Sequence, residues 1–268
     1  MRLNAGFGPF FPACCVICGR IPAPDLDMCP SCLGHLASRI QFDGRNFMFL
    51  CPGCGSDHPG GCPACDDKSS QYARIVCPYR YTFPLNRMIQ ALKYGHDRVM
   101  GRVLGELLAY GLRQEESREA RGGYAVSSSE GAITSPGISP DISSGTSPGT
   151  SPDIVIPVPL HVNRLAQRGF NHAADIARFA ARRLNLPWSD ELAERIEDTG
   201  SLAGLSRAER EHRIRGAFAV SDRVADQHIV IVDDVLTTGA TSGELARELY
   251  DTGAATVELW VVARTPID

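Results

Sequence analysis

The chain has 268 residues and a formal net charge of −4 at pH 7, with 22% charged and 43% hydrophobic residues. This length supports one or two domains, and the composition is that of a globular protein without the basic excess of nucleic-acid-binding domains. No apolar run approaches the ~18 residues that span a membrane, so we expect no membrane insertion. The first residues are rich in Pro and Gly and do not resemble a secretory signal, so we expect a cytoplasmic, reducing compartment.

Cysteines dominate the N-terminal part of the chain. Of the ten cysteines, eight form four CxxC pairs, and in a reducing compartment such pairs indicate metal thiolates rather than disulfides. We predict a small Cys-rich double zinc-ribbon domain over residues 1–70, with one or two structural Zn²⁺ sites. Sequential grouping of the pairs is preferred, while nested grouping and a redox role stay open. The predicted zinc ligands are Cys15, Cys18, Cys29, Cys32, Cys51, Cys54, Cys62 and Cys65.

Downstream of the cysteines, short apolar strands alternate with amphipathic helices, which indicates an α/β domain over residues 71–268. A segment dominated by Ser, Gly, Pro and Thr predicts a disordered insert at about 115–152. The strand at 228–234 is apolar until its end, which favours burial on both faces of a mainly parallel, twisted sheet flanked by helices. In chain order we expect paired short strands within 73–83, helices at 85–93 and 101–113, a strand at 153–159, a helix at 170–184, strand 228–234, a helix at 242–250 and a strand at 256–263.

The segment 229–241, IVIVDDVLTTGAT, carries the clearest chemical pattern. Its buried strand delivers Asp233 and Asp234 to the carboxyl end, where parallel sheets bind ligands. The following turn enters a helix, so its amides and hydroxyls suit a phosphate at the positive end of the helix dipole, and Gly239 permits close approach. Since carboxylates accept hydrogen bonds from sugar hydroxyls, the segment predicts a site for a phosphorylated sugar. A nucleotide-hydrolysing Walker B strand is excluded because the chain lacks a GxxxxGK[ST] loop.

Further candidate residues are basic. Arg164 and Arg168 follow the strand at 153–159, and their planar forks suit diphosphate oxygens; Asn171 stands at the entry of the next helix. A solvated helix face is the alternative for any of these arginines. Lys93 is one of two lysines, and of its two alternatives, a place at the site and a surface position, we prefer the surface. The role of His172 stays open between structural, exposed and catalytic.

The segment 229–241 resembles the phosphoribosyl diphosphate (PRPP) signature of type I phosphoribosyltransferases. Together with the four CxxC pairs, the segments YRYTFPLNRMIQALKYG, IPVPLHVNRLAQRGFNHA and LSRAEREHRIRGAF are similar to the ComF family of competence-associated proteins. This resemblance implies a type I phosphoribosyltransferase fold preceded by zinc ribbons. The chain departs from the family pattern at Leu202 and Arg213, where Gln and Asn are usual, and this departure concerns contacts with the acceptor.

The resemblance also implies roles. Asp233 and Asp234 hold the ribose hydroxyls and the associated Mg²⁺, while Arg164 and Arg168 stabilise the diphosphate. The arginine-rich segment 205–215 resembles a hood that closes over PRPP. The expected function is Mg²⁺-dependent transfer of the phosphoribosyl group to an unidentified acceptor, associated with competence and DNA uptake. The alternatives are a non-catalytic PRPP-binding regulator and an adaptor for single-stranded DNA or DNA-uptake proteins. The implied PRPP-binding residues are Val232, Asp233, Asp234, Val235, Leu236, Thr237, Thr238, Gly239, Ala240, Thr241, Asn171 and Arg207.

Overall fold

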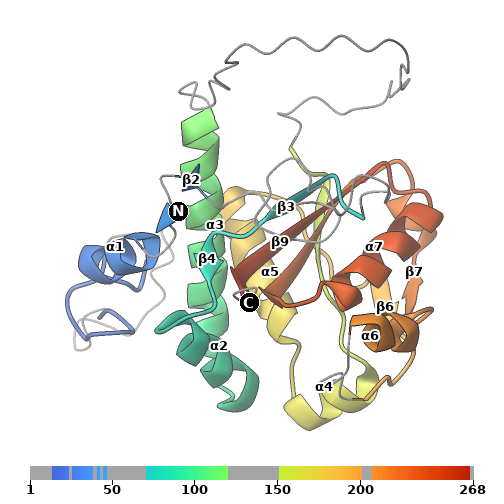
Figure 1. Ribbon diagram of the computed structural model, residues 1–268, viewed down its shortest axis with the longest axis horizontal. Coiled ribbons are helices and arrows are strands. Elements are labelled where there is room, and N and C mark those ends of the chain that lie inside the picture. Colours follow the sequence, from blue (N-terminus) through green and yellow to red (C-terminus); the bar gives the residue numbers. More distant parts are fainter. Residues whose placement is uncertain are drawn as a thin grey trace, which may run out of the picture.

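A five-stranded parallel sheet forms the centre of the computed structural model, with strand order β3-β9-β8-β5 and with β4 also paired to β9 (Figure 1). The strands are β3 (Arg74–Val76), β4 (Tyr79–Arg80), β5 (Ile154–Pro157), β8 (His228–Leu236) and β9 (Thr256–Arg264). The expected α/β fold with a mainly parallel sheet is therefore confirmed. The structure describes residues 14–23, 26–38, 41–42, 45–46, 71–119, 151–200 and 207–265.

The start of the sheet corrects one prediction. The short strands within 73–83 do not pair with each other; β3 and β4 pair one after the other with β9, in parallel. Pro78 lies between them and has no amide hydrogen to donate to a strand ladder, which favours a break at this point. The edge of the sheet is therefore built from two short strands rather than from a hairpin.

Helices cover both faces of the sheet (Figure 1). Alternate residues of β8 lie on opposite faces of the sheet: Val230 and Val232 pack in one hydrophobic core, whereas Ile229 and Ile231 pack in the other. The first core contains α2 (Leu85–Tyr94), α3 (Arg98–Glu119) and α5 (His172–Leu184), and the second contains α6 (Arg207–Ile214), α7 (Ala240–Asp251), β6 (Ala193–Arg195) and β7 (Phe218–Val220). The other elements are α1 (Pro30–Ser38), β1 (Gln41–Phe42), β2 (Arg45–Asn46), α4 (Val162–Arg168) and a short 3-10 helix (Asp222–Val224).

Two helices of the first core bear directly on the predictions. In α2 the buried residues are Leu85, Met88, Ile89 and Leu92, the apolar face that the sequence spacing predicts. Helix α3 continues to Glu119, into the segment predicted as a disordered insert, and most of that segment lies outside the described residues. Within the described ranges, no helix is long and apolar enough to cross a membrane.

The N-terminal segment shares the first core. Cys15, Met28, Cys29 and Leu36 are buried against the α3 side of the sheet, and Arg102 of α3 forms an ion pair with Asp27. Because a short cysteine-rich segment has few large apolar residues of its own, this shared core gives it a surface to fold against. The predicted domain boundary at residue 70 lies outside the described residues.

Candidate functional site

A pocket of about 310 Å³ opens where the parallel strands end. Because all five strands run in the same direction, their carboxyl ends meet at one edge, the edge at which such sheets bind ligands. The lining comes from the residues that follow β4, β5 and β9, from the end of β8, and from neighbouring helices and β6. The lining residues are Tyr81, Lys93, Val158, Leu160, His172, Arg195, Asp233, Asp234, Val235, Thr237, Thr241 and Thr265.

The two adjacent carboxylates of β8 both reach this pocket. Asp233 Oδ1 accepts a 2.8 Å hydrogen bond from the amide of Asp234, and Asp234 Oδ1 accepts one of 2.8 Å from the amide of Val235. Burial, together with the charge of Asp234, raises the pKa of Asp233 to about 7. Burial also acts to raise the pKa of Asp234, but Lys93 and then His172 outweigh it and hold that pKa below its usual range. One carboxylate is therefore firmly charged, while its neighbour titrates near neutral pH.

Lys93 corrects the prediction that it lies at the surface. It stands near the end of α2, and its Nζ lies 2.6 Å from Asp234 Oδ2 inside the pocket. Burial acts to lower the pKa of Lys93, but Asp234 and Asp233 act more strongly and raise it above its usual value. The signal that could have found it is its place next to the predicted buried face of α2, beside Leu92.

His172 connects Asp234 to Arg168. Arg168 Nη1 lies 2.8 Å from His172 Nδ1, and since a guanidinium only donates, Nδ1 must accept and the ring proton is assigned to Nε2. Nε2 in turn lies 3.7 Å from Asp234 Oδ2. Burial is the main cause that lowers the pKa of His172 to about 4, so the ring is neutral at pH 7. The imidazole is thus a neutral bridge between an arginine that follows β5 and a carboxylate at the end of β8.

The turn after β8 presents unused amides. Gly239 has a φ of +73°, in the left-handed region, and α7 begins at the next residue. Between described residues, the amides of 237–241 donate no hydrogen bond. Side-chain hydrogen bonds fix the turn instead: the Tyr72 hydroxyl donates to Ser242 Oγ at 2.8 Å, and Ser242 Oγ donates to the Gly239 carbonyl. A helix N-terminus of this form suits an anion such as a phosphate.

Arginines stand at the β5 and β6 side of the pocket. Arg195 of β6 lines it, and sequence reasoning missed this residue because its short strand carries no motif. Burial and then the positive charge of Arg164 lower the pKa of Arg195, so the two cations are close enough to repel each other. An anion between them relieves such repulsion.

Other predicted residues are placed differently. Arg164 and Arg168 belong to α4 and are not among the lining residues, although Arg168 acts through His172. Asn171 caps α5, because its Oδ1 accepts from the amide of Ala173 and its Nδ2 donates to the carbonyl of Val158, each at 3.0 Å. Arg207 opens α6, and its side chain lies outside the described residues.

The donor atoms in the pocket fit a Mg²⁺ ion. His172, Asp233 and Asp234 place one ligand atom each within 4.8 Å of one another. Because Nε2 of His172 carries the ring proton, the remaining donors are the two carboxylates. Mg²⁺ is commonly held by one or two carboxylates together with water and substrate phosphates, so this donor set is suitable for it.

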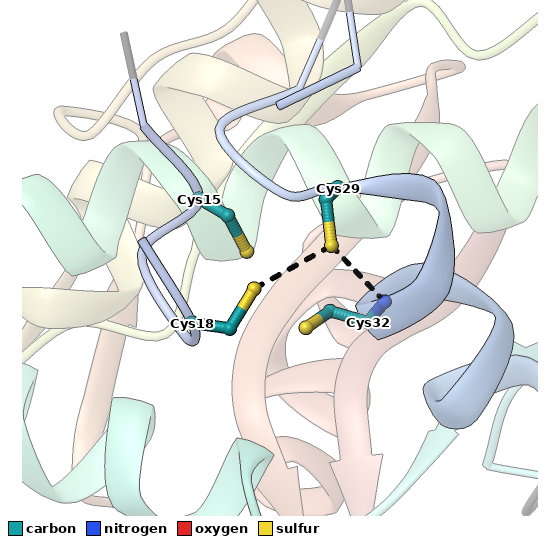
Figure 2. Close-up of side chains that lie close together, drawn as sticks. All are labelled: Cys15, Cys18, Cys29 and Cys32. Carbon is teal, nitrogen blue, oxygen red and sulfur yellow. Dashed lines mark hydrogen bonds between the residues drawn. The ribbon is translucent and has the colours of Figure 1, made fainter. Parts of the chain in front are cut away.

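A second cluster lies in the N-terminal segment. The sulfur atoms of Cys15, Cys18, Cys29 and Cys32 lie within 4.8 Å of one another and point inward (Figure 2). Cys18 Sγ and Cys29 Sγ are 3.6 Å apart, and a tetrahedral Zn²⁺ with Zn–S bonds of about 2.3 Å places sulfur atoms roughly 3.8 Å apart. The sequential grouping of the first two CxxC pairs is therefore confirmed as a four-sulfur cluster able to bind zinc.

Local backbone geometry favours the thiolate form of Cys15 and Cys29, whose pKa values are lowered, whereas burial and then the neighbouring thiols raise the pKa of Cys32. The Cys32 amide donates to Cys29 Sγ at 3.4 Å, and Gly19 turns the chain with a φ of +72°. Burial acts to raise the pKa of Cys15, but backbone hydrogen bonds, that of Cys29 first, lower it to about 6. The other four predicted ligands, Cys51, Cys54, Cys62 and Cys65, lie outside the described residues.

Comparison with known proteins places the whole chain among a set of relatives. No protein-family model matches it. DNA utilization protein YhgH of Salmonella typhimurium is 30% identical, over 95% of this chain and 98% of its own length. YhgH of Escherichia coli K12 is 30% identical over 88% of this chain and 94% of its own length. Competence protein F of Haemophilus influenzae is 24% identical over 95% of this chain and 98% of its own length.

Solved structures match smaller parts of this chain than these relatives do. The glutamine PRPP amidotransferase from B. subtilis is 22% identical, covering 41% of this chain and 22% of that chain, with a TM-score of 0.29. The Trypanosoma cruzi hypoxanthine phosphoribosyltransferase is 16% identical, covering 62% of this chain and 66% of that chain, with a TM-score of 0.32. Because the YhgH relatives match this chain along nearly its full length, the chain belongs to the family of DNA utilization protein YhgH and competence protein F, the ComF family.

Proposed function

We propose that the protein binds PRPP together with Mg²⁺ at the carboxyl edge of its sheet and transfers the phosphoribosyl group to an acceptor. The observation that carries this proposal is that two adjacent carboxylates and a turn with unused amides open on one pocket. The amides of 237–241 suit the 5-phosphate, and Asp233 and Asp234 suit the ribose hydroxyls. When bound, Mg²⁺ supplies charge neutralisation for the diphosphate.

The reaction asks for electrostatic rather than covalent help from the chain. The bond between the anomeric carbon and diphosphate breaks as the acceptor's electron pair forms a new bond to that carbon. Negative charge then grows on the diphosphate, where Arg164, Arg168 and Arg195 are suited to stabilise it, while Asp233 and Asp234 stabilise the positive ribose ring. Closure of the segment 205–215 over the pocket would exclude water from this ring.

A second candidate function is binding of PRPP without turnover. The close pair between Lys93 and Asp234 favours it, because this carboxylate already has a cationic partner before any ligand arrives. The relatives are named for DNA utilization and competence, which supports a role in DNA uptake for either version. In the binding-only version, occupancy of the site by PRPP regulates that role, and an adaptor for single-stranded DNA is the remaining variant.

The test is calorimetry on the full-length, zinc-loaded chain. We expect saturable binding of PRPP that requires Mg²⁺, with one site per chain, and loss of this binding in the Asp233→Asn/Asp234→Asn variant. Ribose 5-phosphate should compete, whereas free ribose should not. Release of diphosphate that depends on an added acceptor separates transfer from binding alone. Absence of saturable PRPP binding to the folded wild-type chain contradicts both versions.

A further inference from the structure

Lys93 is an unusual choice of cation in this chain. Of the 27 Lys and Arg residues, only Lys68 and Lys93 are lysines, and Lys93 is the one that lies within the described residues. An arginine presents a flat, five-donor fork that locks onto carboxylates, whereas a lysine ends in a compact ammonium on a flexible four-carbon stem. A small, movable charge therefore stands at the point where two carboxylates meet.

The ammonium group of Lys93 lies where a divalent metal ion would bind Asp234. Lys93 Nζ lies 2.6 Å from Asp234 Oδ2, with the two side chains 24% and 3% exposed. Asp234 belongs to the group of close donor atoms that also includes His172 and Asp233. A divalent ion bound to Asp234 from the pocket would compete with the ammonium for the same carboxylate.

The ion pair between Arg98 and Asp175 differs from the Lys93 pair in its geometry. Arg98 of α3 binds Asp175 of α5 through two hydrogen bonds, 2.9 Å from Nε and 2.7 Å from Nη2, and Asp175 is 5% exposed. That bidentate pair joins two helices away from the pocket lining. The Lys93 pair has one short contact and lines the pocket, so its cation is free to turn toward a ligand.

We propose that Lys93 is the resident cation of the ligand-free site: it neutralises Asp234, keeps free divalent metal out, and turns to an anionic oxygen of the ligand when metal and ligand arrive together. The identity of that ligand as PRPP rests on the proposed function. The consequence is an order of binding, since the metal enters with its phosphorylated ligand rather than before it. The positive charge of Lys93 is then available to the phosphates at the moment when the metal takes over Asp234.

The experiment measures Mn²⁺ binding by electron paramagnetic resonance, without PRPP, on the zinc-loaded full-length chain. We expect the Lys93→Met variant to bind one Mn²⁺ at least tenfold more tightly than the wild type, because two neighbouring carboxylates then lack a cation. The double variant Lys93→Met/Asp234→Asn should lose this gain. Lys93→Arg keeps a positive charge and should stay close to the wild type. Asp175 is paired with both Arg98 and Arg178, so the double variant Arg98→Met/Arg178→Met removes the cations from another buried carboxylate, away from the pocket; it is the matched control and should show no gain.

Two outcomes overturn the inference. Equal Mn²⁺ affinity in the wild type and Lys93→Met means that the ammonium does not exclude metal. Failure of both Lys93→Met and Lys93→Gln to fold, judged by thermal unfolding with and without Mn²⁺, means that the pair is a permanent structural contact. The two proposals can fail separately. If Lys93→Met gains Mn²⁺ affinity while the wild type does not bind PRPP, Lys93 is still the resident cation, but PRPP is not the ligand.

Discussion

The two edges of the central sheet hold charged groups in different ways. At the amino edge, Glu258 is satisfied by neighbours: its Oε1 lies 3.2 Å from His228 Nε2, and its Oε2 accepts a 2.9 Å hydrogen bond from Trp260 Nε1. At the carboxyl edge, Asp233 and Asp234 line a pocket beside amides that have no partner between described residues. The same two strands, β8 and β9, therefore carry at one end a carboxylate contacted by His228 and Trp260, and at the other two carboxylates that line a pocket, one of them beside Lys93.

The difference follows from strand direction. A parallel strand that ends and turns into a helix delivers its last residues next to the helix N-terminus, where amides are unused and the dipole is positive. The end of β8, the turn and the start of α7 have this arrangement. The amino ends have no such turn, so carboxylates there are stable only where side chains pair with them. The carboxyl edge therefore keeps groups available for a ligand at a cost in stability, whereas the amino edge does not.

The largest expected effect is a loss of stability at the four-cysteine cluster, which lies outside both edges of the sheet. It shows how a variant behaves when stability alone is lost. Cys29→Ser removes one sulfur from the four-sulfur cluster and from the core that the N-terminal segment shares with the sheet. We expect the free energy of unfolding, measured in urea with Zn²⁺ present, to fall by more than about 3 kcal/mol. A matched substitution of the exposed Cys14 should leave it unchanged. Equal stability of both variants would show that the cluster holds no structural metal.

The next largest effect is a loss of PRPP affinity when a carboxylate at the carboxyl edge is removed. Asp233→Asn removes a carboxylate that burial and Asp234 already disfavour in its charged form. We expect PRPP affinity in Mg²⁺ to fall by about 100-fold, which is about 2.7 kcal/mol, because the ribose hydroxyls and the metal lose a charged acceptor. The free energy of unfolding should stay constant or rise by about 1 kcal/mol. Calorimetry and urea unfolding measure the two quantities, and a variant that loses stability and affinity together contradicts the comparison.

The matching substitution at the amino edge should act the other way. Glu258→Gln replaces a partly buried carboxylate that His228 and Trp260 contact. We expect the free energy of unfolding to fall by about 1–2 kcal/mol, since a charge-assisted hydrogen-bond network is weakened. PRPP affinity should remain within about twofold of wild type, because this edge makes no contact with the pocket. A large loss of affinity in the folded variant would mean that the two edges are energetically coupled.

The smallest effect is the response to pH, which should have opposite signs at the two edges. The folded pKa of Asp233, about 7, lies above its ordinary 3.8, so its contribution to the free energy of unfolding falls as pH rises between these values. Burial acts to raise the pKa of Glu258, but His228 and Trp260 lower it below 4.5, so its contribution is lost as pH falls through that lowered pKa. Urea unfolding from about pH 2.5 to 8, a range that covers both windows, should show the Asp233 slope disappear in Asp233→Asn and the Glu258 slope disappear in Glu258→Gln.

The sequence by itself determined those features that depend on neighbours along the chain. The apolar run of β8, its two terminal carboxylates and the glycine turn predict a parallel strand that ends at an anion-binding helix start, and this strand, turn and helix are present. The spacing of Leu85, Met88, Ile89 and Leu92 likewise predicts the buried face of α2. CxxC spacing identified the cysteine pairs and favoured their sequential grouping, and the first four cysteines form one cluster.

Only the tertiary structure decided which distant side chains meet at the site. Lys93, His172 and Arg195 come from α2, α5 and β6, and although Lys93 adjoins the buried face of α2, no local pattern states which of them meets Asp234 or Asp233. The same holds for β3 and β4, whose sequences are suited to a strand but do not state which strand they pair with. Local periodicity reports which face of an element is buried, whereas the contacts of that face depend on how the elements pack against one another, which short-range pattern does not encode.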